Sequence, residues 1–330
     1  MWAFIVRRLI YNVPVYLGII LLAMGMLRVR DPVHGYLGKN ASQEQYQAMK
    51  EKMGLDQPFV VQYGVFLKKV VTLNFREESW AQPGRTVGDI LKTSIPPSMS
   101  ITIPTVMISA MISICIGLIS SYFRGRSIDR SLVILAVLGM SISYLVYIIF
   151  GQFFGAFMPA HSPFAIQGYE SWTTWSSFGP GIPFPVGINP GTWVTYCMLP
   201  VMIGVVVAMG YDTRFYRAVM VEESGRDYII TAMAKGAGKR KIMFVHMLKN
   251  AMIPIITRIM ATLPFLITGS ILLEMYFNIE GMGFQLITAI GNNDFPVIQT
   301  YVAVIAALFI LSIILTDVLY AIVDPRVRLS

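Results

Sequence analysis

Five consecutive residues, Gly236-Ala237-Gly238-Lys239-Arg240, come closest in this chain to a phosphate-binding loop. Such a loop needs glycine, four further residues, a second glycine, lysine, and then serine or threonine. Here Met233 stands in place of the first glycine, and Arg240 stands in place of the hydroxyl residue. This segment therefore does not bind ATP, and we expect any ATP and Mg²⁺ to be bound by partner subunits.

The other residues that could do chemistry are scattered. His34, His161 and His246 fall in separate loops, and no histidine pair has metalloprotease spacing, so we expect no metal site. Cys115 and Cys197 lie in apolar runs, where a small buried hydrophobe is the usual role. No nucleophile, base and orienting group share a motif-like spacing, so we expect no enzyme.

Composition indicates a membrane protein. The 330 residues are 55% hydrophobic and 13% charged, with a mean hydropathy of +0.62, whereas soluble chains carry about 25% charge. These values exclude a soluble enzyme, a disordered chain and a disulfide scaffold. A membrane-crossing helix needs about 20 apolar residues. Six such runs occur, at approximately 9–27, 99–123, 132–158, 193–210, 251–276 and 297–323.

These runs predict an all-α integral membrane protein with six transmembrane helices. We divide the chain into an N-terminal segment with the first helix (1–27), a folded external loop (28–97) and a five-helix core (98–330). The core contains a long cytoplasmic loop at 211–250.

The distribution of lysine and arginine predicts the orientation. Fifteen of the 26 basic residues lie in four short segments, and the alternate segments 159–192 and 277–296 contain none. Because cytoplasmic loops carry the excess of basic residues, we expect both termini in the cytoplasm. The loop 28–97 is too long for this rule to apply. The net charge of +8 therefore reflects topology, and we expect no nucleic-acid partner.

The external loop has its own helix signals. Ser42 and Gln45 form a capping-box pattern that predicts a helix over roughly 43–53. The apolar run 59–67 is too short to cross a membrane and should pack on the surface or against the bundle. Pro96 and Pro97 are expected to precede the second span.

The external segment 159–192 is rich in aromatic residues, among them Tyr169, Trp172 and Trp175. Such rings favour the lipid headgroup region. A contact with substrate or with a receptor is the alternative, and both interpretations stay open.

Three ionisable residues fall within or near the spans. Arg258 either extends to the membrane surface or faces a water-filled path. Glu274 is expected at the other end of the same helix, among the outer headgroups. Asp317 is expected to anchor the last helix against a basic neighbour, with Arg326 and Arg328 close by in sequence.

The cytoplasmic loop contains the most informative segment. Gly225 and Gly236 break it into short helices, and the apolar residues between them are closely spaced. A solvated connector would not need such residues, whereas a helix that docks into a groove of a soluble partner would.

Several motifs resemble permease subunits of the dipeptide/oligopeptide/nickel family of ABC importers. In the loop, Ile230, Thr231 and Ala232 occupy the places of the Glu-Ala-Ala coupling motif, and Gly236 is its glycine. Further matches are Glu274-Met275-Tyr276-Phe277 with Gly281-Met282-Gly283, Asp294-Phe295-Pro296-Val297-Ile298-Gln299, and Gly54-Leu55-Asp56-Gln57-Pro58. The long first external loop resembles the B-type permease. Leu73-Asn74-Phe75-Arg76 and Ile279-Glu280 depart from the family pattern, outside the membrane.

The resemblance implies a type I ABC importer permease-like fold in a bacterial or archaeal cytoplasmic membrane. It implies these partners: a second homologous permease, two nucleotide-binding ATPases and an extracytoplasmic binding protein. Short peptides are the implied substrate, with oligosaccharides or a nickel chelate as alternatives. An ion-coupled carrier is less favoured, because the chain has no acidic residue at a span centre. The residues implied to couple to the ATPases are Asp227, Tyr228, Ile230, Thr231, Ala232, Ala234, Lys235, Gly236 and Ala237.

Overall fold

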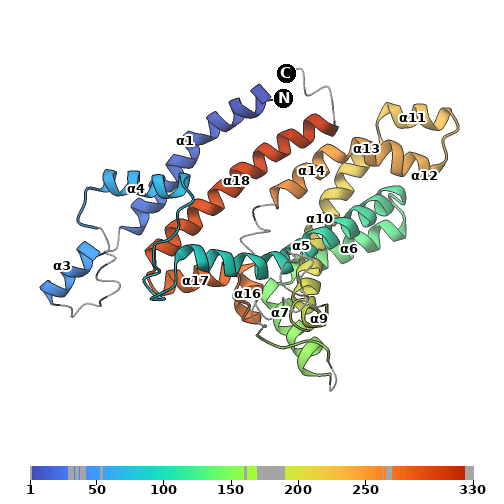
Figure 1. The fold of residues 1–330 in the computed structure, drawn as a ribbon. Coiled ribbons are helices and arrows are strands. Elements are labelled where there is room, and N and C mark those ends of the chain that lie inside the picture. The colour runs from blue at the N-terminus through green and yellow to red at the C-terminus, as the bar shows by residue number, and fades with distance from the viewer. Residues whose placement is uncertain are drawn as a thin grey trace.

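The computed structural model describes residues 2–28, 33, 37, 42–52, 55–159, 162–168, 190–262, 264 and 270–323. Within these ranges the protein is helical, and its β-structure is one isolated bridge between Glu78 and Thr86. Figure 1 shows an elongated arrangement in which α1 (Trp2–Leu27) and α18 (Phe295–Val323) run side by side. A second group consists of α5 (Val87–Tyr122), α6 (Ser127–Ser141) and α10 (Met198–Ser224).

Among the described residues, four helices are long and apolar enough to cross a membrane, namely α1, α5, α10 and α18. Two further pairs pass the same test only if each bent pair is taken as one span. The first joins α6 to α7 (Tyr144–Gly151) and the π-helix η1 (Gln152–Phe157), with a bend of 89°. The second joins the continuous helix 239–250 to α14 (Met252–Ala261), with a bend of 56°. Six spans are therefore confirmed only with two of them bent.

The expected continuous helices over 132–158 and 251–276 are wrong. In the first, Ile142 adopts an extended conformation between α6 and α7. The Ser141 hydroxyl donates to the Val137 carbonyl at 2.7 Å, a bond that competes with regular helix geometry. In the second, α14 ends at Ala261, and a separate helix, α16 (Ile271–Phe277), follows an extended Ser270. Arg258 and Glu274 therefore lie on different helices.

Helix α5 begins earlier than predicted. Its N-cap is Thr86, whose hydroxyl oxygen accepts a hydrogen bond from the Asp89 amide at 3.1 Å. Pro96, Pro97 and Pro104 all lie inside the helix, so the expectation that Pro96 and Pro97 precede it is wrong. A proline deprives the carbonyl four residues earlier of its helical donor. For Pro104 that carbonyl belongs to Ser100, and the Trp193 indole donates to it at 3.2 Å.

Glycines let α5, α6 and α10 pack closely. A Cβ atom on Gly117 of α5 would lie 2.9 Å from the Arg217 amide nitrogen of α10. A Cβ atom on Gly210 of α10 would lie 2.9 Å from the Met140 amide nitrogen of α6. Small residues at helix contacts are the usual means of bringing backbones together in membranes, where apolar side chains gain little by leaving lipid.

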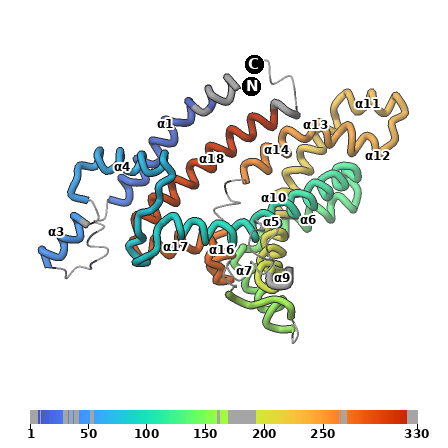
Figure 2. The backbone as a smooth tube through the Cα atoms, viewed as in Figure 1, coloured from blue at the N-terminus to red at the C-terminus, as the bar shows by residue number. Residues whose placement is uncertain are grey.

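The segment before α5 is folded, as predicted. Helix α3 (Gln43–Lys52) begins with the expected capping box, because Ser42 and Gln45 exchange hydrogen bonds of 3.2 and 3.3 Å. The apolar run continues as α4 (Phe59–Val71), which packs against α1 rather than crossing. The Tyr63 hydroxyl donates to the Leu17 carbonyl at 2.8 Å. Figure 2 shows α4 lying across α1.

Two of the described short helices each precede a long one. Helix α9 (Pro190–Tyr196) precedes α10, and α17 (Met282–Gly291) precedes α18. Asp294, between α17 and α18, is 2% exposed and accepts hydrogen bonds from the Ser79 hydroxyl and from the amides of Trp80 and Ala81. The segment before α5 is thereby bound to the start of α18.

Candidate functional site

The predicted coupling segment forms a separate short helix, α11 (Asp227–Ala234), which Figure 1 shows projecting at one end of the molecule. Gly225 ends α10 two residues before it. After α11 the chain enters a continuous helix made of α12 (Lys239–Lys241), the π-helix η2 (Ile242–Met247) and α13 (Leu248–Asn250). The breaks expected at Gly225 and Gly236 are confirmed and α11 between them is short, but residues 211–224 belong to the long α10 rather than to a short helix.

Gly236 terminates α11 in a Schellman motif. The Ala237 amide donates to the Ala232 carbonyl at 3.0 Å, and the Gly236 amide donates to the Met233 carbonyl at 2.9 Å. This motif requires a left-handed residue, and Gly236 has φ +77. A Cβ atom there would meet nothing within 4 Å. The glycine is therefore required by backbone conformation and not by crowding.

Helix α11 has two different faces. Ile229 and Ala232, which are 3% and 8% exposed, turn inward, and Ile229 belongs to an apolar cluster with Leu118, Met220 and Met247. The opposite face is open, since Ile230 is 59% exposed and Met233 is 53% exposed. The remaining exposed positions are Asp227, Thr231, Ala234, Lys235 and Gly236.

Two residues assigned to coupling face the chain's own helices. Ala232 is buried, and Tyr228 is half-buried with its hydroxyl donating to Glu223 at the end of α10. Burial raises the pKa of Tyr228 to about 12, and the bond to Glu223 acts in the same direction. Tyr228 therefore stays neutral, and its hydrogen bond to Glu223 connects α11 to the end of α10. Ala237, the last residue of the predicted set, is also half-buried.

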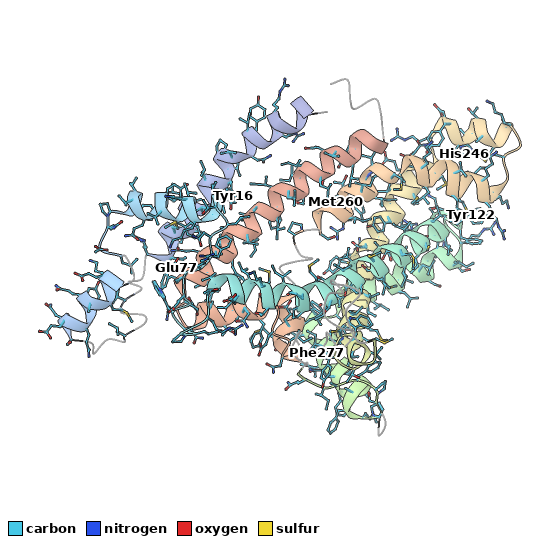
Figure 3. All side chains as sticks on the ribbon, viewed as in Figure 1. Tyr16, Glu77, Tyr122, His246, Met260 and Phe277 are labelled. Atoms are coloured by element: carbon cyan, nitrogen blue, oxygen red, sulfur yellow. The ribbon has the colours of Figure 1, made fainter. Side chains whose placement is uncertain are left out.

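A buried ion pair fixes the helices beneath α11. Asp129 on α6 accepts two hydrogen bonds from the Arg217 guanidinium on α10, at 2.7 and 2.8 Å. The Ser120 hydroxyl on α5 donates to the same carboxylate. Lys239 lies 5.7 Å from the centre of the Tyr122 ring, and Figure 3 labels Tyr122 and His246 at this end of the molecule. Sequence reasoning missed this pair, although both partners lie in segments that it assigned to one side.

Arg258 on α14 pairs with Asp212 on α10. The two side chains meet at 2.9 Å, and the Arg258 side chain is 40% exposed. Neighbouring Thr257 and Tyr320 join α14 to α18 by a hydroxyl–hydroxyl bond. The sequence suggested that Arg258 extends to the membrane surface or faces a water-filled path. It did not predict an ion pair with α10.

Asp317 on α18 pairs with Arg8 on α1 at 3.1 Å. The expected anchor is thus a basic residue of the first helix. Arg326 and Arg328 lie outside the described residues.

Glu274 is 1% exposed and lies on α16, so the expectation that it shares a helix with Arg258 is wrong. Its carboxylate accepts hydrogen bonds from the Ser98 hydroxyl at 2.6 Å and from the Phe284 amide at 2.9 Å. The Ser98 oxygen accepts in turn from the Met282 amide at 2.7 Å. Glu274 and Ser98 therefore cap the N-terminus of α17. A Cβ atom on Gly281 would lie 2.5 Å from the Ser98 oxygen, which explains the glycine.

A cavity of about 200 Å³ lies between α5, α7, α10 and α16. Its lining is uncharged, and its polar groups are mostly hydroxyls, from Thr102, Thr105, Tyr144 and Ser270. The Tyr144 and Ser270 hydroxyl oxygens lie 3.3 Å apart. Among the described residues no group of three or more His, Cys, Asp or Glu could bind a metal ion. Tyr169, Trp172 and Trp175 lie outside the described residues.

Comparisons with known proteins agree with this architecture. Residues 113–329 match the model of the family "Binding-protein-dependent transport system inner membrane component", and residues 1–84 match the corresponding N-terminal model. The chain is 30% identical, over 99% of its length and all of the relative, to the probable peptide ABC transporter permease protein y4tP of Sinorhizobium fredii. It is 28% identical, over 99% of its length and all of the relative, to the oligopeptide transport system permease protein AppB of Bacillus subtilis.

The matched region 113–329 contains α11, the Asp129–Arg217 pair and the Glu274 cap. The chain belongs to the family of inner membrane components of binding-protein-dependent transport systems and is a multi-pass permease subunit.

Proposed function

We propose that this permease subunit carries short peptides through the membrane in an ATP-driven importer and that the exposed face of α11 contacts the ATPase. The observation that carries the proposal is the division of α11 into a buried and an exposed face. Ile229 and Ala232 seat the helix on the permease, while Ile230 and Met233 remain exposed. An apolar pair spaced by three residues is the pattern with which a helix enters a groove of its partner.

The contacts around α11 support transmission of movement from such a partner. Tyr228 contacts the end of α10, and Met247 of the following helix packs in the same apolar cluster as Ile229. A displacement of α11 would therefore act on α10 and on the helix that leads to α14. A ligand or partner shifts a conformational equilibrium only through contacts that differ between the two states, and a flexible tether would not provide them.

The proposed assembly contains a second, homologous permease, two ATPase subunits and an extracytoplasmic binding protein. Met233 and Arg240 break the phosphate-loop pattern in this chain. The proposal therefore assigns the binding of ATP and Mg²⁺ to the ATPase subunits. The proposed orientation has both termini in the cytoplasm. In this orientation α11 lies on the cytoplasmic side of the membrane, where ATP is present.

Short peptides are the proposed substrate because relatives covering the whole chain are named as peptide permeases. The uncharged cavity beside α5 and α10 fits this choice. Peptides vary in side-chain charge, and a neutral wall favours neither sign. Oligosaccharides and a nickel chelate are the alternatives, to be distinguished by the ligand of the binding protein.

Ile230→Asp tests the docking face, because it places a charge on an exposed position without entering the core. We expect loss of substrate-stimulated ATP hydrolysis and of transport in the reconstituted complex, with normal membrane insertion. Val60→Asp on α4 is the matched control, since Val60 is an apolar residue that is 76% exposed and lies far from Ile230 in the sequence. Unchanged coupled ATP hydrolysis in Ile230→Asp would refute the docking face.

A further inference from the structure

A second cavity, of about 270 Å³, lies where α1, α4 and the start of α18 meet the segment before α5. In Figure 3, Glu77 labels this region, which is well separated from the end that carries His246 and α11. The cavity shares no lining residue with the uncharged cavity beside α10. The function proposed above makes no use of it.

Arg28 is the distinctive residue of this cavity. One of its terminal nitrogens donates to the Gln62 side chain, and its guanidinium lies 5.0 Å from the centre of the Phe59 ring. Its Nε atom is buried without a hydrogen-bond partner in the described structure. Burial lowers the pKa of Arg28, but a guanidinium remains protonated in proteins. Among the described residues no carboxylate pairs with this cation, and a buried N–H without an acceptor costs free energy until an anion approaches it.

The guanidinium is oriented rather than free to turn away. The Gln62 side chain accepts from Arg28 through its oxygen and donates from its nitrogen to the Gln57 carbonyl at 2.6 Å. The ring of Phe59 supports the guanidinium through its π face. A preorganised guanidinium is the side chain best suited to a planar oxyanion.

The charges of the lining indicate a ligand with a single negative charge. Among the described residues that line it, Arg28, Lys69 and Glu77 are the charged ones. Lys69 and Glu77 neutralise each other at 2.6 Å, which leaves the charge of Arg28. A monoanion balances this charge, whereas a dianion such as a phosphate monoester would be in excess.

The remaining lining indicates an apolar group beside the anion. Trp80 and Phe295 pack with ring centres 5.5 Å apart, and both line the cavity together with Met24 and Phe66. The amide of Gln299 on α18 adds a neutral polar group. The volume is below the roughly 300 Å³ at which pockets for drug-sized ligands begin, so the occupant is small.

We propose that this cavity binds a small apolar monocarboxylate, whose carboxylate contacts Arg28 and whose apolar part lies against Trp80 and Phe295. A ligand there would contact α1, α4, α18 and the segment before α5 at once, and would stabilise their arrangement. The site shares no lining residue with the cavity beside α10 and does not rest on peptide import.

Calorimetric titration of the full-length chain in lipid nanodiscs tests the site, with N-acetylleucine as the probe. N-acetylleucinamide is the matched control ligand, since it differs by the loss of the charge. We expect saturable binding of the acid and binding of the amide weaker by about tenfold or more. Absence of saturable binding, or equal binding of acid and amide, overturns the proposal.

Variants test the assignment to Arg28. Arg28→Gln is expected to weaken binding of the acid by about tenfold or more. Arg85→Gln, which removes an arginine that does not line the cavity, should bind as the parent does. Gln299→Phe fills the cavity from α18 and retains Arg28, so it is expected to abolish binding even if Arg28→Gln folds poorly. Undiminished binding in Gln299→Phe overturns the location. Peptide import could fail in a separate assay without affecting these results.

Discussion

Two serines at different levels of α5 each donate a hydrogen bond to a carboxylate on another helix. The two carboxylates are stabilised differently. Ser120 contacts Asp129, which is paired with Arg217. Ser98 contacts Glu274, which is bound by hydroxyl and backbone N–H groups. The serines are separated by 22 positions (120 minus 98), or about 33 Å of helix. We call these regions the α11 end (Ser120, Asp129, Arg217 and α11) and the α17 end (Ser98, Glu274 and α17).

The difference follows from where the basic residues lie. Neither α16 nor segment 277–296, which contains α17, has a lysine or arginine, and Glu274 and Asp294 bind hydroxyl and backbone N–H groups instead. The segments near α11 contain arginines, so carboxylates there join long helices through ion pairs. The cap of α17 joins α5 and α16 to the backbone N–H groups that begin α17, whereas an ion pair joins helices only through flexible side chains and can separate when the helices move. We therefore expect the helices at the α17 end to move together, and the helices at the α11 end to be able to move relative to one another.

The largest expected effect comes from Asp129→Ala at the α11 end. The Asp129 side chain is 5% exposed and that of Arg217 is 28% exposed, so the change leaves a largely buried guanidinium unpaired. Loss of one partner of a buried pair costs about 3–5 kcal/mol. We expect a lower unfolding temperature in detergent. The double variant Asp129→Ala with Arg217→Met should recover part of the loss, and no recovery would show that Asp129 acts independently of Arg217.

A smaller loss is expected from Gly281→Ala at the α17 end. The added Cβ atom would overlap Glu274 and Ser98, and overpacking of this kind typically costs about 1–3 kcal/mol. Gly291→Ala is the matched control on the same helix, because a Cβ atom there meets nothing within 4 Å. Equal unfolding temperatures for the two variants would contradict the capped arrangement.

The smallest expected effect is that of Gly236→Ala, which alters α11 without changing an ion pair. Alanine in a left-handed conformation costs about 1 kcal/mol, and coupled ATP hydrolysis should fall while membrane insertion is retained. Gly238→Ala is the control, because Gly238 has φ -65 and open space around it. If Gly238→Ala lowered coupled ATP hydrolysis as much as Gly236→Ala, the prediction that coupling depends on the Schellman motif would be wrong.

Local signals predicted two helix termini well, the end of α11 and the start of α3. Gly236 and the Ser42–Gln45 capping box depend on neighbours along the chain, and both are confirmed. The inward direction of Ala232 could not be read from the motif, because it depends on where the helix contacts α10.

Contacts between distant segments were not predictable in the same way. Glu274 lies in an apolar stretch that favours a continuous span, yet Ser98, 176 positions away, makes its burial favourable. Pro96 and Pro97 were taken as a helix boundary because proline disfavours helix interiors. The Thr86 cap ten residues earlier outweighs that local preference.

The π-helix η2 affects how this chain tolerates insertions and deletions. A π-turn accommodates one residue more than an α-turn, so the part of the helix after Met247 is out of phase with a regular wheel drawn from Lys239. Deleting one residue within α5 would turn every later side chain by about 100°. Deleting one residue within Ile242–Met247 can instead be absorbed by a return to α winding. Length variation should therefore be tolerated better in η2 than in a long regular helix such as α5.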